Sequence, residues 1–206
     1  SEHGNIFDFL MRTQNLKFGE AVKTLAQQAG MRPYTFSKAD EEREKAWKEY
    51  AGIYSDYVNF FHNELLNNSD SKLSLNYLKN RKINLETIKS FKIGYVKKNL
   101  NLFANLEKKF TKKAIKECGI FYFDEKKNVL IDRFRGRIIF PINSISGSPI
   151  AIGGRIMEKN SFFAKYINSP ETQFFKKGNN LYNIDKARAL SNKYEQIFLV
   201  EGYMDV

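Results

Sequence analysis

Residues 120–157 read IFYFDEKKNVLIDRFRGRIIFPINSISGSPIAIGGRIM, and this stretch decides the fold class. It contains four apolar or β-branched runs, at 120–123, 129–131, 137–142 and 150–157. Clusters of turn-forming residues at 124–128 and 144–148 lie between runs. Because β-branched and aromatic residues favour strands while Asp, Asn, Ser and Gly favour turns, the pattern predicts strands of one sheet, joined largely by hairpins.

Helical periodicity marks the residues before this stretch. Asn5 can cap a short helix, and a second apolar stripe, Ala21 to Ala29, is closed by Gly30. Residues 33–39 lack periodicity and are expected to form a linker. A long helix should follow and end at 67–70, since large side chains recur every three or four residues and form one buried face. These side chains are Trp47, Tyr50, Tyr54, Tyr57, Phe61 and Leu65.

Further elements are expected on both sides of the sheet. Short helices are predicted at 74–80, 84–91, 100–109 and 111–117, with a strand near 93–96. Asn183 can cap a helix to about Leu190, and the apolar run at 196–200 is typical of a strand buried in a parallel sheet. The expected fold class is α/β in the mixed α+β sense, with a helical N-terminal segment before a mixed, largely antiparallel sheet with helices.

Composition excludes several classes of protein. With 42 % hydrophobic and 15 % aromatic residues, the chain can bury a core and is not expected to be disordered. It has no run of roughly 18 apolar residues and its start lacks the features of a signal peptide, so a cytoplasmic protein that does not span a membrane is expected. Its one cysteine, Cys118, excludes an intramolecular disulfide and a Cys-rich zinc site.

The positive charge is concentrated in one segment. The net charge is +11. Between Lys72 and Lys116 there are 13 Lys and Arg against Glu86 and Glu107, whereas the rest of the chain holds 21 residues of each sign. Such clustering indicates a polyanion partner, because basic side chains release counterions from nucleic-acid phosphates. The alternative is an AT-rich genome, which would supply 25 Lys and 20 Asn without any partner.

Two carboxylates follow the apolar run at 196–200. Glu201 stands at its end, before Gly202, and Asp205 lies four residues on. Carboxylates at strand ends of α/β sheets commonly face a ligand, and their hard oxygens suit Mg²⁺. An ordinary strand exit with a solvated Glu produces the same pattern.

Basic and aromatic residues are interleaved through residues 132–178. Arg133, Arg135 and Arg137 are spaced at period two, so in a strand they would share one face. Arg155 follows two glycines, which allow a phosphate or another backbone to approach. The segments 165–172 and 174–178 combine cations, aromatics and hydrogen-bonding groups, as a groove for single-stranded nucleic acid would. Each segment alone is also compatible with a solvated hairpin edge.

Five of these motifs, in this order, resemble the signatures of bacterial DnaG-type DNA primases. They are DRFRGRIIFPI at 132–142, IAIGGRIM at 150–157, KYINSPET at 165–172, FKKGNNLY at 175–182 and LVEGYMDV at 199–206. YLKNR at 77–81 and FKIGY at 91–95 are similar to the start of the family's polymerase core, although Lys82 stands where the family usually has Gly. HGNIFDFL at 3–10 and FGEA at 18–21 are similar to the tail of its zinc-binding domain.

The resemblance implies three parts of a longer protein. Residues 1–38 would be the tail of the zinc-binding domain and a linker, and residues 39–190 the amino-terminal subdomain of the RNA polymerase core. Residues 191–206 would begin a Toprim α/β domain, with its first strand in the run at 196–200, and without the strands that flank it in that domain this run is expected to fray. The zinc ligands would precede Ser1 and an Asp-x-Asp metal motif would follow Val206, so this chain is expected to lack a zinc site and to be inactive alone.

The same resemblance implies a nucleotidyltransferase that makes short RNA primers for replication on single-stranded DNA. Two Mg²⁺ or Mn²⁺ ions would serve the transfer, with Glu201 as catalytic carboxylate and metal ligand and Asp205 as a weaker ligand. Zn²⁺ would be confined to the zinc-binding domain. The nucleic-acid and nucleotide contacts would come from Arg81, Arg155, Lys165, Tyr166, Asn168 and Lys177, with Arg133, Arg135 and Arg137 as second-line candidates.

The expected partners are a single-stranded DNA template, an RNA–DNA hybrid, ribonucleoside triphosphates, the replicative helicase and a single-strand-binding protein, all at the nucleoid and none at a membrane. We expect the basic residues Arg81, Arg155, Lys165 and Lys177, with Tyr166, to converge near Glu201. Two alternatives remain. One is another Toprim enzyme, such as a topoisomerase or a nuclease, and the other is a nucleic-acid-binding module without catalytic activity.

Overall fold

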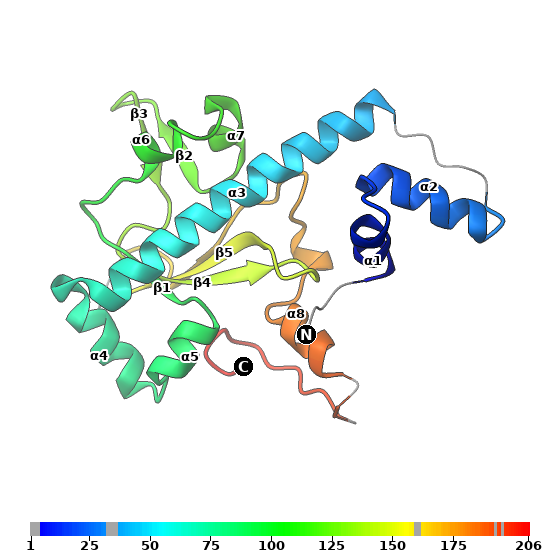
Figure 1. The fold of residues 1–206 in the computed structure, drawn as a ribbon. Helices are drawn as coiled ribbons and strands as arrows, with labels where there is room; N and C mark the ends of the chain where they lie inside the picture. Colours follow the sequence, from blue (N-terminus) through cyan, green and yellow to red (C-terminus); the bar gives the residue numbers. More distant parts are fainter. Residues whose placement is uncertain (1–4, 32–36, 159–161, 192, 195) are drawn as a thin grey trace. The chain divides into compact units, whose positions relative to one another are not determined.

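The computed structural model describes residues 5–31, 37–158, 162–191, 193–194 and 196–206. The chain folds into two compact units, Ser1–Ala46 and Trp47–Val206 (Figure 1). Most of the linker expected at 33–39 lies outside the described residues, and its last two residues already belong to a helix. Among the described residues, no helix has both the length and the apolar character that a membrane span requires.

The first unit contains helices α1 (Ile6–Thr13) and α2 (Phe18–Gln28). The Asn5 side chain accepts bonds from the N–H groups of Phe7 and Asp8 at 2.9 and 3.0 Å, and the Asp8 carboxylate accepts from the Asn5 N–H at 2.8 Å. This reciprocal cap satisfies amide groups that a helix start leaves free. Gly30 adopts φ +67° beyond the end of α2. Both helices, the cap and the glycine stop are confirmed.

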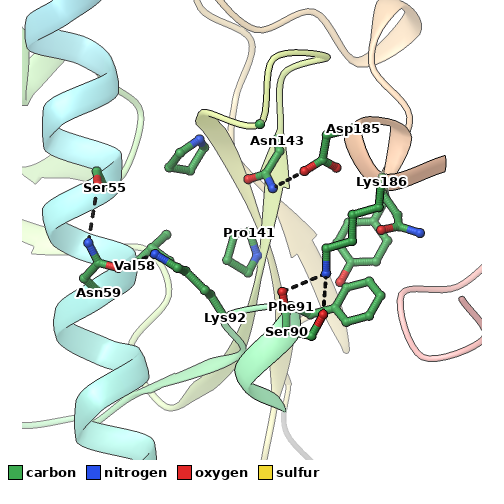
Figure 2. Close-up of a pocket in the computed structure, with 14 residues that line it drawn as sticks. Ser55, Val58, Asn59, Ser90, Phe91, Lys92, Pro141, Asn143, Asp185 and Lys186 are labelled. Atoms are coloured by element: carbon green, nitrogen blue, oxygen red, sulfur yellow. Dashed lines mark hydrogen bonds between the residues drawn. The ribbon is translucent and has the colours of Figure 1, made fainter. Parts of the chain in front are cut away.

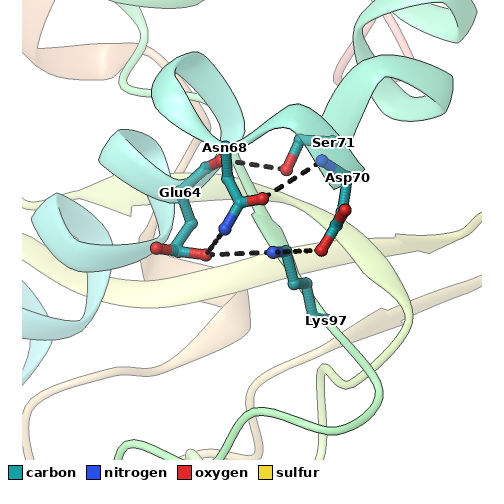
Figure 3. A network of polar contacts seen from close by, with 5 residues as sticks. All are labelled: Glu64, Asn68, Asp70, Ser71 and Lys97. Atoms are coloured by element: carbon teal, nitrogen blue, oxygen red, sulfur yellow. Dashed lines mark hydrogen bonds and ion pairs between the residues drawn. The ribbon is translucent and has the colours of Figure 1, made fainter.

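The long helix and the short helices are also confirmed, with shorter bounds than expected for some. They are α3 (Lys38–Asn67), α4 (Lys72–Asn80), α5 (Leu85–Ser90), α6 (Phe103–Leu106), α7 (Lys112–Glu117) and α8 (Ile184–Leu190). Two 3-10 turns, η1 (Ser69–Ser71) and η2 (Lys177–Asn179), were not predicted. α3 ends in a network of polar contacts, shown in Figure 3. Lys97 forms ion pairs with Glu64 and Asp70 at 3.4 and 3.3 Å, and the Ser71 hydroxyl donates to the Glu64 carbonyl at 2.8 Å.

The aromatic stripe of α3 is core, as predicted. Tyr54, Tyr57 and Phe61 are fully buried. The hydroxyls of its tyrosines reach groups far away in the sequence. Tyr50 donates to the Ile150 carbonyl at 2.6 Å, Tyr54 to the Cys118 carbonyl at 2.8 Å and Tyr57 to both carboxylate oxygens of Asp132 at 2.8 and 2.9 Å. A buried hydroxyl needs such a partner, because an unpaired one loses its bonds to water.

The strands form two antiparallel sheets. One has the order β1-β4-β5-β6 and the other pairs β2 with β3. The bounds are β1 (Gly94–Val96), β2 (Phe121–Asp124), β3 (Val129–Asp132), β4 (Arg137–Asn143), β5 (Pro149–Ile156) and β6 (Tyr166–Asn168). The predicted hairpins β2–β3 and β4–β5 are confirmed, and β6 was not expected as a strand.

The prediction of one sheet is wrong, because the chain turns between β3 and β4. Residues 133–136 form this turn, with Gly136 at φ +72°. The Gly136 N–H donates to the Val96 carbonyl at 2.7 Å, so β1 rather than β3 lies beside β4. β1 also passes against α3, since a Cβ on Gly94 would lie 2.9 Å from the Phe61 carbonyl carbon.

The core lies on both faces of the four-stranded sheet. Successive residues of β4 point to opposite faces, so Ile139 packs with the α3 aromatic stripe while Ile138 and Phe140 pack with residues of α4 and α5. In Figure 1, α3 crosses the sheet, while α4 and α5 lie below the strands in this view. β6 is the last strand of this sheet, so its residues lie at the sheet edge and can contribute to a surface site.

The run at 196–200 forms no strand, and Ile197, Phe198 and Leu199 are 69, 84 and 83 % exposed. This agrees with the expectation that the run frays without flanking strands, since no strand in the described part of the chain pairs with it. The expected cap of α8 is wrong. Asn183 does precede α8, but its side chain makes no cap bond and its backbone adopts φ +64°.

Candidate nucleic-acid interface

A cavity of about 680 Å³, here called the Arg155 cavity, brings together most of the predicted site residues. Residues from the end of α4, from β5 and β6, from the start of α8 and from the last ten residues line it. Among them are Arg81, Arg155, Lys165, Tyr166, Asn168, Glu201 and Asp205. Of the residues singled out from the sequence, the cavity thus brings together three cations, the Tyr166 ring, Asn168 and two carboxylates.

Arg81 reaches this cavity because α4 stops at Asn80. Arg81 is the C-terminal cap of the helix, and Lys82 adopts φ +62°. This is the left-handed region, which glycine adopts at the least cost. The departure at Lys82 from the glycine usual in DnaG-type primases therefore keeps the backbone turn but adds strain.

Arg155 lies between two aromatic rings. Its guanidinium carbon is 5.0 Å from the ring centre of Tyr77 and 5.1 Å from that of Tyr166, its partner residue across β5 and β6. It also donates to the Tyr166 hydroxyl at 2.5 Å. Cation–π contacts of this kind hold a guanidinium in place. Its Nε is buried without a hydrogen-bond partner among the described residues.

Tyr203 docks the residues around Glu201 onto the sheet. Its ring stacks on Phe140 with centres 5.4 Å apart, meets Tyr182 edge-on, and its hydroxyl donates to the Asn168 side-chain oxygen at 2.7 Å. Burial raises the pKa of Tyr203 to about 12. Gly153 lies beneath this ring, and a Cβ there would overlap it. The glycine leaves the space that Tyr203 occupies.

Glu201 and Asp205 are both exposed in the Arg155 cavity. Their oxygens are suitable ligands for Mg²⁺ or Mn²⁺. Among the described residues no group of three or more His, Cys, Asp or Glu is placed to hold a metal ion. These two carboxylates suit a metal ion, but they are too few to form a complete metal site.

Lys177 is not among the residues that line the Arg155 cavity. It begins η2, its side chain is exposed, and its N–H donates to the Glu171 carboxylate at 2.9 Å. The expected convergence therefore holds for Arg81, Arg155, Lys165 and Tyr166 but not for Lys177.

The three arginines of 133–137 line a second cavity of about 680 Å³, here called the Arg133 cavity. The prediction that they share one face of a strand is wrong, because Arg133 and Arg135 lie in the turn before β4. Arg133 lies over the Tyr122 ring at 5.3 Å. Arg135 is exposed, whereas Arg137 is 5 % exposed and donates only to backbone carbonyls among the bonds described.

Figure 2 shows a smaller cavity between α3, α5 and α8. Lys186 donates to the carbonyl and hydroxyl of Ser90 at 2.7 and 2.9 Å and lies over the Phe91 ring at 3.6 Å. Asp185 accepts from Asn143 at 2.8 Å. Asp185 and Lys186 thus both bind other parts of the chain and hold α8 in place, so this cavity is a structural feature of the fold.

Sequence reasoning did not assign roles to Tyr77, Tyr122 or Tyr203. Tyr77 lies four residues before Arg81 on α4, a spacing that puts two side chains on one helix face and could have indicated it. The roles of Tyr122 and Tyr203 depend on contacts with distant residues, for which no local pattern exists.

Comparison with known proteins places the chain in a family. Residues 60–188, more than half of the chain, match the family described as DNA primase catalytic core, N-terminal domain. A DNA primase of Clostridium acetobutylicum is 35 % identical over 213 residues, covering 99 % of this chain and 33 % of that protein. The chain thus spans about one third of the length of the curated relatives that it matches.

Solved structures agree with the sequence match. The zinc-binding and RNA polymerase domains of Aquifex aeolicus primase have a TM-score of 0.69 and 27 % identity, covering 98 % of this chain and 47 % of that one. A DnaG primase catalytic domain bound to single-stranded DNA has a TM-score of 0.70 and 27 % identity, covering 79 % of this chain and 50 % of that one. The chain therefore belongs to the bacterial DnaG-type DNA primases and includes the N-terminal domain of their catalytic core.

Proposed function

We propose that this chain is the template-binding part of a DNA primase, a nucleotidyltransferase that synthesises short RNA primers on single-stranded DNA and releases pyrophosphate. The observation that carries the proposal is the Arg155 cavity, where Arg81, Arg155 and Lys165 gather with the Tyr166 ring beside Glu201. A related catalytic domain has been solved with single-stranded DNA. Three cations suit a phosphate backbone, and an aromatic ring suits bases of any sequence.

Each side chain has a proposed task. Arg155 and Arg81 would grip phosphates, since a guanidinium presents several N–H groups in a plane that matches phosphate oxygens. Lys165 would add a mobile charge, and Tyr166 a stacking surface. Lys177 would bind the strand outside the Arg155 cavity, where its exposed side chain lies.

Glu201 and Asp205 would hold Mg²⁺ or Mn²⁺ together with ligands from elsewhere in the longer protein. Bound ions of this kind polarise the attacking hydroxyl and stabilise the charge on the leaving pyrophosphate. The chain's own contribution is the docking of Tyr203, which keeps both carboxylates beside the cations of the cavity.

The same proposal assigns the three parts of the chain and its partners. Residues 1–38 would belong to a zinc-binding domain, 39–190 to the polymerase core and 191–206 to a Toprim domain. An RNA–DNA hybrid, ribonucleoside triphosphates, the replicative helicase and a single-strand-binding protein would be partners, with the protein acting at the nucleoid in the cytoplasm.

Binding of a labelled oligo-dT to this chain, measured by fluorescence anisotropy over a range of salt, tests the template contacts. Affinity should fall steeply with salt, with a slope of roughly −0.7 for each phosphate neutralised on a single strand. Lys165→Ala should weaken binding and flatten the slope. Lys126→Ala removes the same charge from an exposed position in the turn between β2 and β3, outside the basic segment 72–116, and is the matched control. Equal effects of the two variants would refute the assigned interface.

Primer synthesis by the longer protein tests the catalytic assignment. Glu201→Gln keeps the size of the side chain and removes its charge, so ribonucleotide incorporation should be lost while oligo-dT binding is retained. Full incorporation by this variant would mean that Glu201 is outside the active site.

A further inference from the structure

Arg137 differs from the other basic residues near the two cavities in what its side chain binds. It is the first residue of β4 and is 5 % exposed. Its Nη1 donates to the Ala164 carbonyl at 3.0 Å, the Lys165 carbonyl at 3.3 Å and the Gly154 carbonyl at 3.4 Å. A guanidinium nitrogen directed at backbone oxygens in the interior is poorly placed to grip a phosphate.

The segment that Arg137 holds lies at the edge of the sheet. β6 is only three residues long, and its first residue, Tyr166, pairs with Arg155 of β5. Residues 162–165 before it belong to no helix or strand, and the Phe162 side chain is fully exposed. The Lys165 carbonyl, just before β6, accepts from the Ile156 N–H of β5 at 3.0 Å. Arg137 donates to that same Lys165 carbonyl and to the one before it.

Lys165 and Tyr166 both project from this point of the chain. Their side chains are exposed in the Arg155 cavity, and Tyr166 contacts Arg155. An exposed side chain takes its position from its backbone, and here the backbone is held at the carbonyls of residues 164 and 165. The two cavities meet at this point, since Arg137 and Ala164 line the Arg133 cavity while Lys165, the next residue, lines the Arg155 cavity.

We infer that Arg137 is a positioning residue for nucleic-acid binding: it fixes the backbone at 164–165 and thereby sets the positions of Lys165 and Tyr166. The inference rests on the proposed function of those two residues. It separates Arg137 from Arg133 and Arg135, with which its spacing grouped it, because its charge stabilises carbonyl dipoles within the fold.

A double-mutant cycle distinguishes positioning from direct contact. Oligo-dT affinity is measured for the unsubstituted chain, Arg137→Met, Lys165→Ala/Tyr166→Ala and the triple variant. Arg137→Met should lower affinity by roughly tenfold, since loss of one aromatic stacking contact has about that effect. In the background that already lacks both side chains, Arg137→Met should cause no further loss.

The outcomes separate the two levels of the proposal. If Lys165→Ala/Tyr166→Ala binds oligo-dT as tightly as the unsubstituted chain, the proposed function fails at these residues. If that variant binds weakly but Arg137→Met reduces affinity further by the same factor in both backgrounds, Arg137 touches the strand itself and the inference is overturned. Lys126→Met, at an exposed position outside the basic segment 72–116, controls for the loss of one positive charge.

Hydrogen exchange gives a second readout that needs no ligand. The Ile156 amide donates to the Lys165 carbonyl, so its protection reports whether residue 165 stays on β5. Arg137→Met should lose this protection, while amides in the β2–β3 hairpin keep theirs. Arg137→Lys, which keeps the charge and the buried stem, repeats both measurements if the Met variant does not fold. Unchanged Ile156 protection in a folded variant would overturn the inference.

Discussion

Substituting Asp132 by Asn should make the stability of this protein less dependent on pH. Asp132 is 4 % exposed, and its carboxylate accepts bonds from the Tyr57 hydroxyl and, at 2.7 Å, from the Phe134 N–H. Burial raises the pKa of Asp132 from 3.8 to about 6, although these two bonds and the charge of Arg135 act in the opposite direction. Loss of hydration outweighs the compensating contacts.

The sign of the effect follows from proton binding. The folded protein holds the Asp132 proton more tightly than the unfolded chain, so the stabilisation is complete below about pH 4 and is lost as pH rises through about 6. The difference between the two pKa values corresponds to about 3 kcal/mol. That is a large part of the roughly 5–15 kcal/mol that stabilises a typical domain. Asn keeps an oxygen for the Tyr57 hydroxyl and has no proton to lose.

Urea unfolding at a series of pH values from 4 to 8 measures the effect. Other groups titrate alike in both proteins, so the difference between their unfolding free energies isolates Asp132. The unfolding free energy of Asp132→Asn, relative to that of the unsubstituted protein, should rise by about 3 kcal/mol as the pH is raised from 4 to 8. Glu125→Gln removes an exposed carboxyl from the same hairpin and serves as control. Parallel plots of unfolding free energy against pH for Asp132→Asn and the unsubstituted protein would contradict the prediction, because they would show that the buried carboxyl does not change its charge between pH 4 and 8.

Three further substitutions test contacts described above. Gly153→Ala should displace the Tyr203 ring and increase hydrogen exchange at residues 203–206. Gly178→Ala, with no atom within 4 Å of the new Cβ, should leave this exchange unchanged. Equal exchange in the two variants would refute the docking of Tyr203 on the sheet. Tyr54→Phe leaves the Cys118 carbonyl without its 2.8 Å donor and should lower the free energy of unfolding by about 1–3 kcal/mol in a urea titration, and an unchanged midpoint would contradict this. Lys97→Met removes two partly exposed ion pairs and should lower the free energy of unfolding by less than about 1 kcal/mol. This loss should shrink in high salt, and a loss that does not depend on salt would contradict the electrostatic explanation.

Local patterns predicted most of the elements. The Asn5 cap, the aromatic stripe of α3 and the β4–β5 hairpin each depend on residues close together in the sequence, and all three are confirmed. The separation of β2–β3 from the main sheet was not predicted, because it depends on Gly136 pairing with Val96, 40 positions earlier. Strand pairing is chosen by such distant partners, which propensity does not encode.

The candidate site shows the same division. The resemblance to DnaG-type primases indicated Arg81, Arg155, Lys165, Tyr166 and Glu201, and the structure gathers them around one cavity. The period-two spacing of Arg133, Arg135 and Arg137 predicts a shared face only within a strand, and the chain turns there instead. The apolar run at 196–200 forms no strand because a strand requires a partner, and fraying is what its expected flanking strands imply when they are absent.

The tyrosine hydroxyls of α3 restrict how this molecule can move. Tyr50, Tyr54 and Tyr57 bond to three separate segments of the chain. Sliding the helix by one turn would bring Trp47 or Phe61 to one end of this row in place of a tyrosine, so one buried carbonyl or carboxylate would lose its hydroxyl donor. Such a loss costs about 1–3 kcal/mol, so the hydroxyls favour one register of the helix even though the apolar stripe itself would tolerate another. A rearrangement that keeps all three bonds must carry this part of α3 together with both sheets.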